Sequence, residues 1–148
     1  MKEKGFTLLE LLVVILIVGV LAGIALPQYQ LAKEKVIMTE GINLAKQIIS
    51  SSERYYLLHN VYANKMEDLD IEFIGSKTLD ERIITNHFII SPFGTEAELV
   101  VIQRIPRATR YYLSILKQTP NRINCVSYSK ASNVQKKLCG KFSSTGHL

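Results

Sequence analysis

The sequence of 148 residues has few of the side chains that most catalytic and metal sites use. Its three histidines, His59, His87 and His147, are too far apart in sequence for metal-ligand spacing. No carboxylate follows Glu98, so residues 99–148 cannot supply the several carboxylate oxygens of a calcium site. We also find no nucleophile motif and no phosphate-binding loop. The sequence therefore predicts a protein that is not an enzyme and that holds no cofactor or metal.

The absence of acidic residues after position 98 divides the charge unevenly. The chain has 18 Lys and Arg against 13 Asp and Glu, a net charge of +5. Residues 99–148 hold 9 of the basic residues, so the first 98 carry 9 − 13 = −4. Basic side chains interleaved with tyrosines suggest nucleic-acid binding, and the candidate anion or DNA contacts are Arg104, Arg107, Arg110, Lys136 and Lys137. We favour instead a contact with the acidic stretches 67–72 and 80–81 of a neighbouring copy.

Cysteine is also scarce, because Cys125 and Cys139 are the only two. An even pair in an exported domain favours a disulfide over a metal site. Closing so short a loop is worth about 3 kcal/mol by chain-entropy estimates. Two unrelated buried thiols are the alternative, and we favour it less.

One long apolar segment stands near the start of the chain. Residues 11–26 are uncharged, and with Leu8 and Leu9 they match a membrane helix, since roughly 20 residues cross the hydrocarbon layer. The basic flank in residues 1–5 predicts a cytoplasmic N-terminus. Glu10 lies inside this span, where an ionised side chain costs about 2.5 to 3.5 kcal/mol. A simple anchor has no reason to carry that carboxylate.

The helical pattern continues beyond the apolar segment. Residues 28–58 alternate apolar positions at spacings of three and four, which predicts an amphipathic helix with one side on a soluble core. The two segments together predict one helix of about 50 residues. Pro27 removes a backbone hydrogen bond and predicts a kink, and Gly19 and Gly23 weaken the same stretch.

The remainder of the chain, residues 59–148, has the pattern of a small sheet. We expect a connecting loop over residues 59–84, with a short helical turn near 65–69. Predicted strands lie at 87–90, 99–102, 111–116 and 123–128, separated by turn residues at 91–94, 105–107 and 119–121. Such spacing predicts an antiparallel sheet packed on the amphipathic helix, an α+β fold.

The segment Lys4-Gly5-Phe6-Thr7-Leu8-Leu9-Glu10, with Gly19 and Pro27 beyond it, resembles the N-terminal motif of type IV pilins and the related pseudopilins. The resemblance implies cleavage between Gly5 and Phe6, N-methylation of Phe6 and a role for Glu10 in assembly. It implies a leader at residues 1–5, a transmembrane and filament-core half at 6–27, an amphipathic half at 28–58 and a globular head at 59–148. The head would carry a disulfide-closed C-terminal loop.

The same resemblance implies a structural subunit of a pilus used for adhesion, motility or DNA uptake. Its partners would be other copies of the chain in a helical filament, the prepilin peptidase and methyltransferase, the inner-membrane assembly machinery and membrane lipid. Before assembly the chain would be a single-pass inner-membrane protein, and afterwards part of an extracellular filament. A pseudopilin of type II secretion or a minor pilin that primes assembly is one alternative, and a membrane-anchored binding protein that never polymerises is another. The paired cysteines and the lack of C-terminal carboxylates favour a pilin, because the major pseudopilins of type II secretion as a family have the opposite features.

Glu10 gains a physical explanation from this resemblance. Cleavage would expose the amine of Phe6, and the ammonium of a neighbouring subunit could then lie beside the Glu10 carboxylate. Their pairing would offset the desolvation of both charges in an apolar filament core. We therefore expect Glu10 to set the register between subunits.

Overall fold

The computed structural model describes residues 5–63, 65–73, 77–79, 82–92, 98–105 and 111–145. The described elements are helix α1 (Leu8–His59), the 3-10 helix η1 (Met66–Asp68), strands β1 (Lys77–Leu79), β2 (Arg82–Ile84), β3 (Phe88–Pro92), β4 (Glu98–Arg104), β5 (Tyr111–Leu116) and β6 (Thr119–Ser127), and helix α2 (Asn133–Thr145). The chain divides into two compact units, Met1–Lys33 and Glu34–Leu148, which we call the N-terminal unit and the head unit. The predicted α+β class is confirmed.

Helix α1 is 52 residues long and confirms the single long helix expected from the sequence. It passes through Pro27 without interruption, and the kink there stays a prediction. The helix ends where Asn60 adopts a left-handed conformation, with φ of 56°, while its N–H still donates to the Tyr56 carbonyl at 2.8 Å. Asparagine tolerates this conformation better than most residues, which explains the end point.

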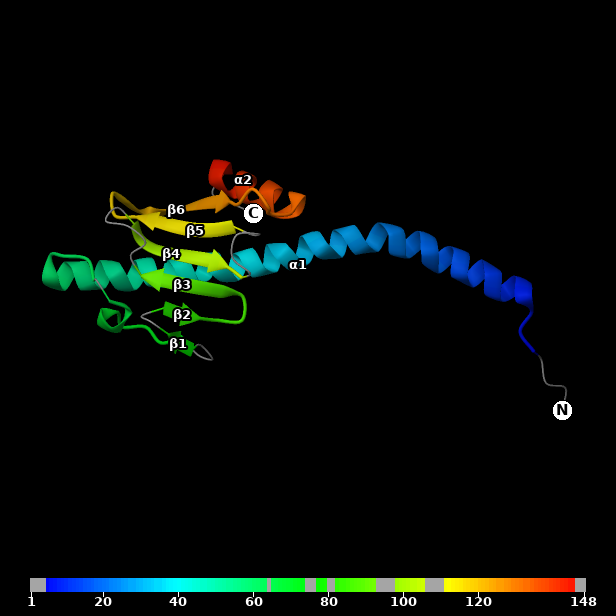
Figure 1. Cartoon of the computed structure of the whole chain (residues 1–148), viewed down its shortest axis with the longest axis horizontal. Helices are drawn as coiled ribbons and strands as arrows, with labels where there is room; N and C mark the ends of the chain where they lie inside the picture. Colours follow the sequence, from blue (N-terminus) through cyan, green and yellow to red (C-terminus); the bar gives the residue numbers. More distant parts are fainter. Residues whose placement is uncertain are drawn as a thin grey trace. The chain divides into compact units, whose positions relative to one another are not determined.

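The described strands form one antiparallel sheet in the order β1-β2-β3-β4-β5-β6, so each strand pairs with its neighbours in sequence (Figure 1). The pairing of β3 with β4 places Phe88 opposite Arg104, and that of β5 with β6 places Leu113 opposite Cys125. Side chains alternate between the two faces of a strand. The inward positions of β3, β4 and β5 therefore form one continuous apolar face.

The structure corrects the expected organisation in three places. Strands β1 and β2 lie where we expected a connecting loop, although the helical turn expected near 65–69 is confirmed as η1. Strand β6 already begins at Thr119 and includes Pro120, which we had assigned to a turn. Proline is tolerated there because β6 is at the edge of the sheet. The C-terminal region is closed by the expected Cys125–Cys139 disulfide, but it also contains α2, a helix that we did not predict.

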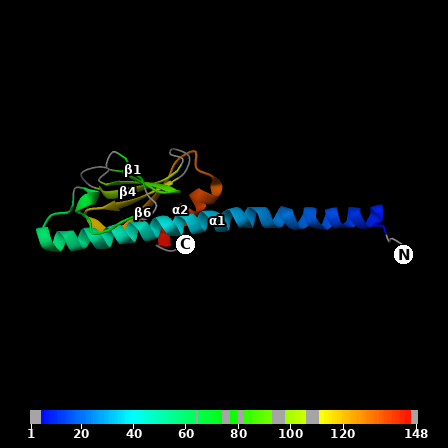
Figure 2. The same ribbon diagram turned by 90° about the horizontal axis from the view of Figure 1, so that it is seen from below.

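In the head unit, α1 lies along one face of the sheet (Figure 2). Met38, Ala45 and Ile48 of α1 are buried in one cluster with Phe88 and Leu113 of the strands. Gly41 marks the closest approach of helix and sheet: a Cβ atom there would lie 2.8 Å from Phe88 Cζ and 3.2 Å from Leu113 Cδ1. The absence of a side chain at Gly41 therefore lets α1 lie directly on the Phe88 ring.

Helix α2 packs beside β6 through a mostly apolar inner face that includes Leu138 and Phe142. The Cys125–Cys139 disulfide joins β6 to α2, as predicted. The Ser143 hydroxyl donates to the Cys125 carbonyl at 2.9 Å and supports the same junction. At the start of the helix, Ser132 and Gln135 form reciprocal capping hydrogen bonds of 3.1 and 3.3 Å.

Candidate functional site

Thr7 and Glu10 form a capping box at the start of α1. The Glu10 carboxylate accepts hydrogen bonds from the Thr7 N–H and hydroxyl, each at 2.8 Å, and the Glu10 N–H donates to the Thr7 hydroxyl at 3.2 Å. These bonds satisfy backbone donors that the first helical turn leaves open. The carboxylate also lies at the positive end of the helix dipole. Glu10 therefore has a structural role in its own chain besides the intersubunit role expected of it.

Gly5 and Phe6 precede this box and lie outside the helix. Both are exposed, and the Phe6 ring is 87% exposed. A protease needs an accessible, unwound segment, and the described conformation of these two residues meets that requirement. Cleavage after Gly5 and methylation of Phe6 remain predictions.

The N-terminal unit contributes a large uncovered apolar surface. Every described residue from 5 to 33 is exposed, and the large apolar side chains between Leu8 and Leu31 are 41 to 88% exposed. This part of α1 is long and apolar enough to cross a membrane. So extensive an apolar surface marks a membrane or protein contact.

Gly19, Gly23 and Pro27 lie on that bare stretch of α1. A Cβ atom at Gly19 or Gly23 would meet no described atom within 4 Å, apart from the neighbouring residues and the backbone of the helix itself. Packing within the chain therefore does not require glycine at these two positions, in contrast to Gly41. Their expected contribution to helix flexibility stays a prediction.

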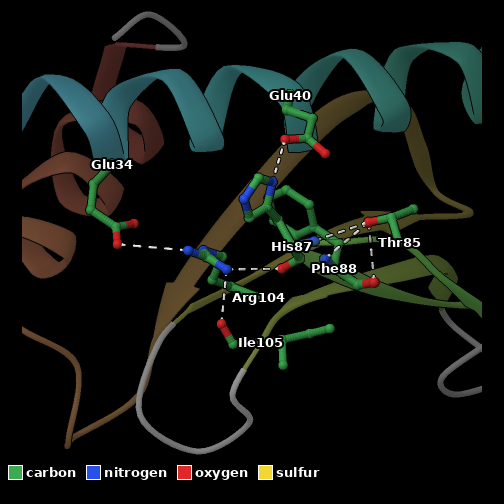
Figure 3. Close-up of polar contacts among 7 residues, drawn as sticks. All are labelled: Glu34, Glu40, Thr85, His87, Phe88, Arg104 and Ile105. Carbon is green, nitrogen blue, oxygen red and sulfur yellow. Dashed lines mark hydrogen bonds and ion pairs between the residues drawn. The ribbon is translucent and has the colours of Figure 1, made fainter. Parts of the chain in front are cut away.

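A polar cluster holds α1 to the end of β4 in the head unit (Figure 3). Arg104 donates to the carbonyl of His87 at 3.1 Å and to that of Ile105 at 2.8 Å, and it lies 3.8 Å from the Glu34 carboxylate. His87 Nδ1 lies 2.8 Å from Glu40 Oε2. Glu34 and Glu40 of α1, six residues or about 1.7 turns apart, are thereby tied to the sheet.

Arg104 is consequently not a surface residue, and its assignment as an anion or DNA contact is wrong. Only 7% of Arg104 is exposed, and its guanidinium lies 5.9 Å above the Phe88 ring. Arg107 and Arg110 lie outside the described residues. Lys136 and Lys137 are exposed on α2, so they remain available for contacts with a partner.

A second polar contact ties the end of α1 to the segment that follows it. The Asp70 carboxylate accepts hydrogen bonds from Arg54 at 2.6 and 2.7 Å and from the buried Ser51 hydroxyl. These bonds hold the pKa of Asp70 well below its usual range, chiefly because of the bonds from Arg54 and then that from Ser51. The same contact raises the pKa of Arg54. Asp70 therefore stays ionised at neutral pH and anchors the chain after η1.

Sequence reasoning missed three of these features for different reasons. The spacing of Thr7 and Glu10 fits the Ser/Thr-x-x-Glu pattern of a capping box, so that signal was available. Nothing local marks Gly41 as a contact point or Asp70 as the partner of Arg54. Both depend on segments that are far apart in sequence.

Comparison with known proteins supports the N-terminal motif that the sequence analysis identified. Residues 1–26 match a family model described as the prokaryotic N-terminal methylation motif. The chain is 36% identical over 91 residues to the type IV major pilin protein PilE1 of Neisseria gonorrhoeae, covering 56% of this chain and 42% of that protein. It is 34% identical over 82 residues to a fimbrial protein of Pseudomonas aeruginosa, covering 53% of each chain.

A third relative is the fimbrial protein EcpC of Eikenella corrodens, 48% identical over 54 residues, which are 36% of this chain and 35% of that protein. The chain thus spans about half or less of the length of the curated relatives that it matches. No solved structure matches it.

Proposed function

We propose that this chain is a member of the type IV pilin family and the structural subunit of a pilus, because residues 1–26 match the N-terminal methylation motif and its curated relatives are pilins and fimbrial proteins. The observation that carries the proposal is the bare apolar surface of the N-terminal unit, with the Glu10 carboxylate at its start. The lipid bilayer covers this surface in the stored subunit, with the N-terminus cytoplasmic and the head unit outside the inner membrane. Copies of the same helix cover it in the extracellular filament.

Processing precedes assembly in this proposal. A prepilin peptidase cuts between Gly5 and Phe6, and the new N-terminus is methylated. The resulting ammonium of Phe6 lies directly before Thr7, the first residue of the capping box in its own chain, and pairs with the Glu10 carboxylate of a neighbour. Removing both charges from water together costs less than burying either one alone. The pairing therefore favours one register between adjacent helices.

Variants of Glu10 test this role, because its capping hydrogen bonds and its negative charge can be removed separately. Glu10→Gln keeps an oxygen that can accept the capping hydrogen bonds from Thr7 but has no charge. Glu10→Ala loses both. We expect both variants to insert in the membrane and to be cleaved normally, while the yield of sheared filaments falls at least about tenfold, as for a buried charge left unpaired.

Thr7→Val is the matched control, because it loses the hydroxyl of the capping box and keeps the Glu10 charge. We expect it to assemble with a much smaller loss than Glu10→Gln. Normal filament yield from Glu10→Gln would show that capping alone accounts for Glu10. Normal yield from Glu10→Ala as well would refute the assembly role of this side chain.

The C-terminal part of the head unit favours a pilin over a secretion pseudopilin. It carries the Cys125–Cys139 disulfide and has no carboxylate after Glu98 for a calcium ion. A minor pilin that primes assembly has the same N-terminal requirements and differs in abundance. Quantifying this chain in sheared filaments separates the two roles, and we expect it to be the most abundant component.

A further inference from the structure

One flank of α1 in the head unit is hollowed by two adjoining cavities. The first has a volume of about 460 Å³ and is lined by Val36, Thr39, Glu40, Asn43, Leu44 and Gln47. The second, of about 350 Å³, shares Glu40, Leu44 and Gln47 with the first and adds Glu72, Phe73, Thr85 and Asn86. Because they share three residues, the cavities form one continuous groove, which we call the acidic groove.

The lining of the acidic groove combines apolar side chains with negatively charged ones. Val36 is 69% exposed on α1, and Leu44 and Phe73 pack only partly against the core. Glu72 supplies one carboxylate and Glu40 a second, whose Oε2 already lies 2.8 Å from His87 Nδ1, and none of the described lining residues is lysine or arginine. The groove therefore suits a partner with a basic, partly apolar ridge.

Helix α2 of the same chain has a basic ridge. Its inner face is buried against β6, whereas Lys136, Lys137 and Lys141 are exposed. Lys137 and Lys141 are four residues apart and so occupy the same face, one turn apart. Its 13 residues give a ridge of about 20 Å. Lys46 and Arg122 add positive charge nearby, between α1, β6 and α2.

The two surfaces lie at opposite ends of the strand order and cannot meet within one chain. Thr85 and Asn86 of the groove lie between β2 and β3, and Glu72 and Phe73 precede β1. Helix α2 packs on β6, at the other edge of the sheet (Figure 1). Two different, complementary patches on one molecule produce a head-to-tail contact, which continues into an open helical array when it does not close.

We propose that the lysine ridge of α2 docks in the acidic groove of a second copy of this chain. The proposal rests on the filament function and names the contact between head units. Exposed charge pairs contribute modestly when isolated, but packing of the N-terminal helices holds neighbouring heads at high effective concentration. The contact then selects which neighbour each head unit faces and is weakened by salt.

Charge exchange between the two surfaces provides the test, with full-length chain assembled in a host that has the pilus machinery. The groove variant is Gln47→Lys/Glu72→Lys, and the ridge variant is Lys137→Glu/Lys141→Glu. We expect each to reduce sheared filament about tenfold relative to membrane-bound chain, through like-charge contact. Combining all four substitutions should restore the yield to within about twofold. Lys65→Glu/Lys130→Glu, which makes the same charge change as the ridge variant in exposed loops, should have little effect.

A cross-linking measurement keeps the test independent of folding of the charge variants. Gln47→Cys with Lys137→Cys should give disulfide-linked ladders in oxidised filaments, whereas Gln118→Cys with Lys137→Cys should not. Failure of the combined charge variant to recover, or filaments without ladders, would overturn the docking contact and leave the filament function intact. Absence of any filament from the unaltered chain would instead refute the filament function itself.

Discussion

The two units use the same helix in opposite ways. In the N-terminal unit every described side chain of α1 is exposed, whereas in the head unit Met38, Ala45 and Ile48 of α1 are at most 2% exposed. The head unit has its own sheet to cover its apolar stripe, and the N-terminal unit has none. A helix that is apolar on all sides and that the described residues of its chain leave exposed requires a partner outside it. The head unit is therefore stabilised within its own chain, whereas the proposed assembly covers the apolar surface of the N-terminal unit.

Substitutions of two phenylalanines test the difference between the units with the largest expected effect. Phe88→Ala removes a fully buried ring and should lower the free energy of unfolding of the head unit by about 3 to 5 kcal/mol. Phe6→Ala removes an exposed ring and should leave that value unchanged. Denaturant unfolding of the full chain in detergent measures both. Similar losses from the two substitutions would contradict the division between the units.

Substitutions of two glycines test the same difference with a smaller expected effect. Gly41→Ala introduces a methyl group 2.8 Å from the Phe88 ring and should cost about 1 to 3 kcal/mol through overpacking. This loss is reduced because alanine favours a helix by about 1 kcal/mol over glycine. Gly19→Ala meets no described neighbour outside its helix and should not destabilise the head unit. A neutral Gly41→Ala would show that the Phe88 ring can move away.

The contact of Asp70 with Arg54 and Ser51 predicts a smaller, pH-dependent effect. Because the folded state lowers the pKa of Asp70, the unfolded chain binds more protons in acid. Stability from this group should be complete above about pH 4, the ordinary aspartate range, and should be lost as the pH falls further. Asp70→Asn should reduce stability at neutral pH and flatten the acid dependence. Thermal unfolding of full chain in detergent between pH 2 and pH 7 checks the prediction; an unchanged slope in the variant would exclude Asp70 as its source.

Much of the architecture could be predicted because its signals are local. The long helix follows from apolar periodicity, and the four runs of β-branched and aromatic residues correspond to β3, β4, β5 and β6. Strands β1 and β2 were missed because three residues are too few for an alternating pattern. Helix α2 was missed although Ser132 and Gln135 have capping-box spacing and Val134, Leu138 and Phe142 recur every four residues. The sequence of α2 therefore does contain local signals of a helix.

In the candidate site too, some residues could be predicted from local sequence and others could not. Glu10 was identifiable because a carboxylate in an apolar span is conspicuous. Arg104 was misassigned because its neighbours in the sequence are basic. In the fold its guanidinium lies beside the carboxylate of Glu34, which is distant in the sequence. The acidic groove assembles residues from α1, the segment before β1 and the β2–β3 connection. No local pattern could have shown it.

The most direct test of the central claim, that copies of this chain cover one another's N-terminal units, is the mass of the N-terminal peptide in sheared extracellular filaments. The account predicts that the filaments consist mainly of this chain and that their subunits begin at N-methylated Phe6. A chain that keeps Met1 and stays in the membrane fraction, in a host with an active prepilin peptidase, would contradict it.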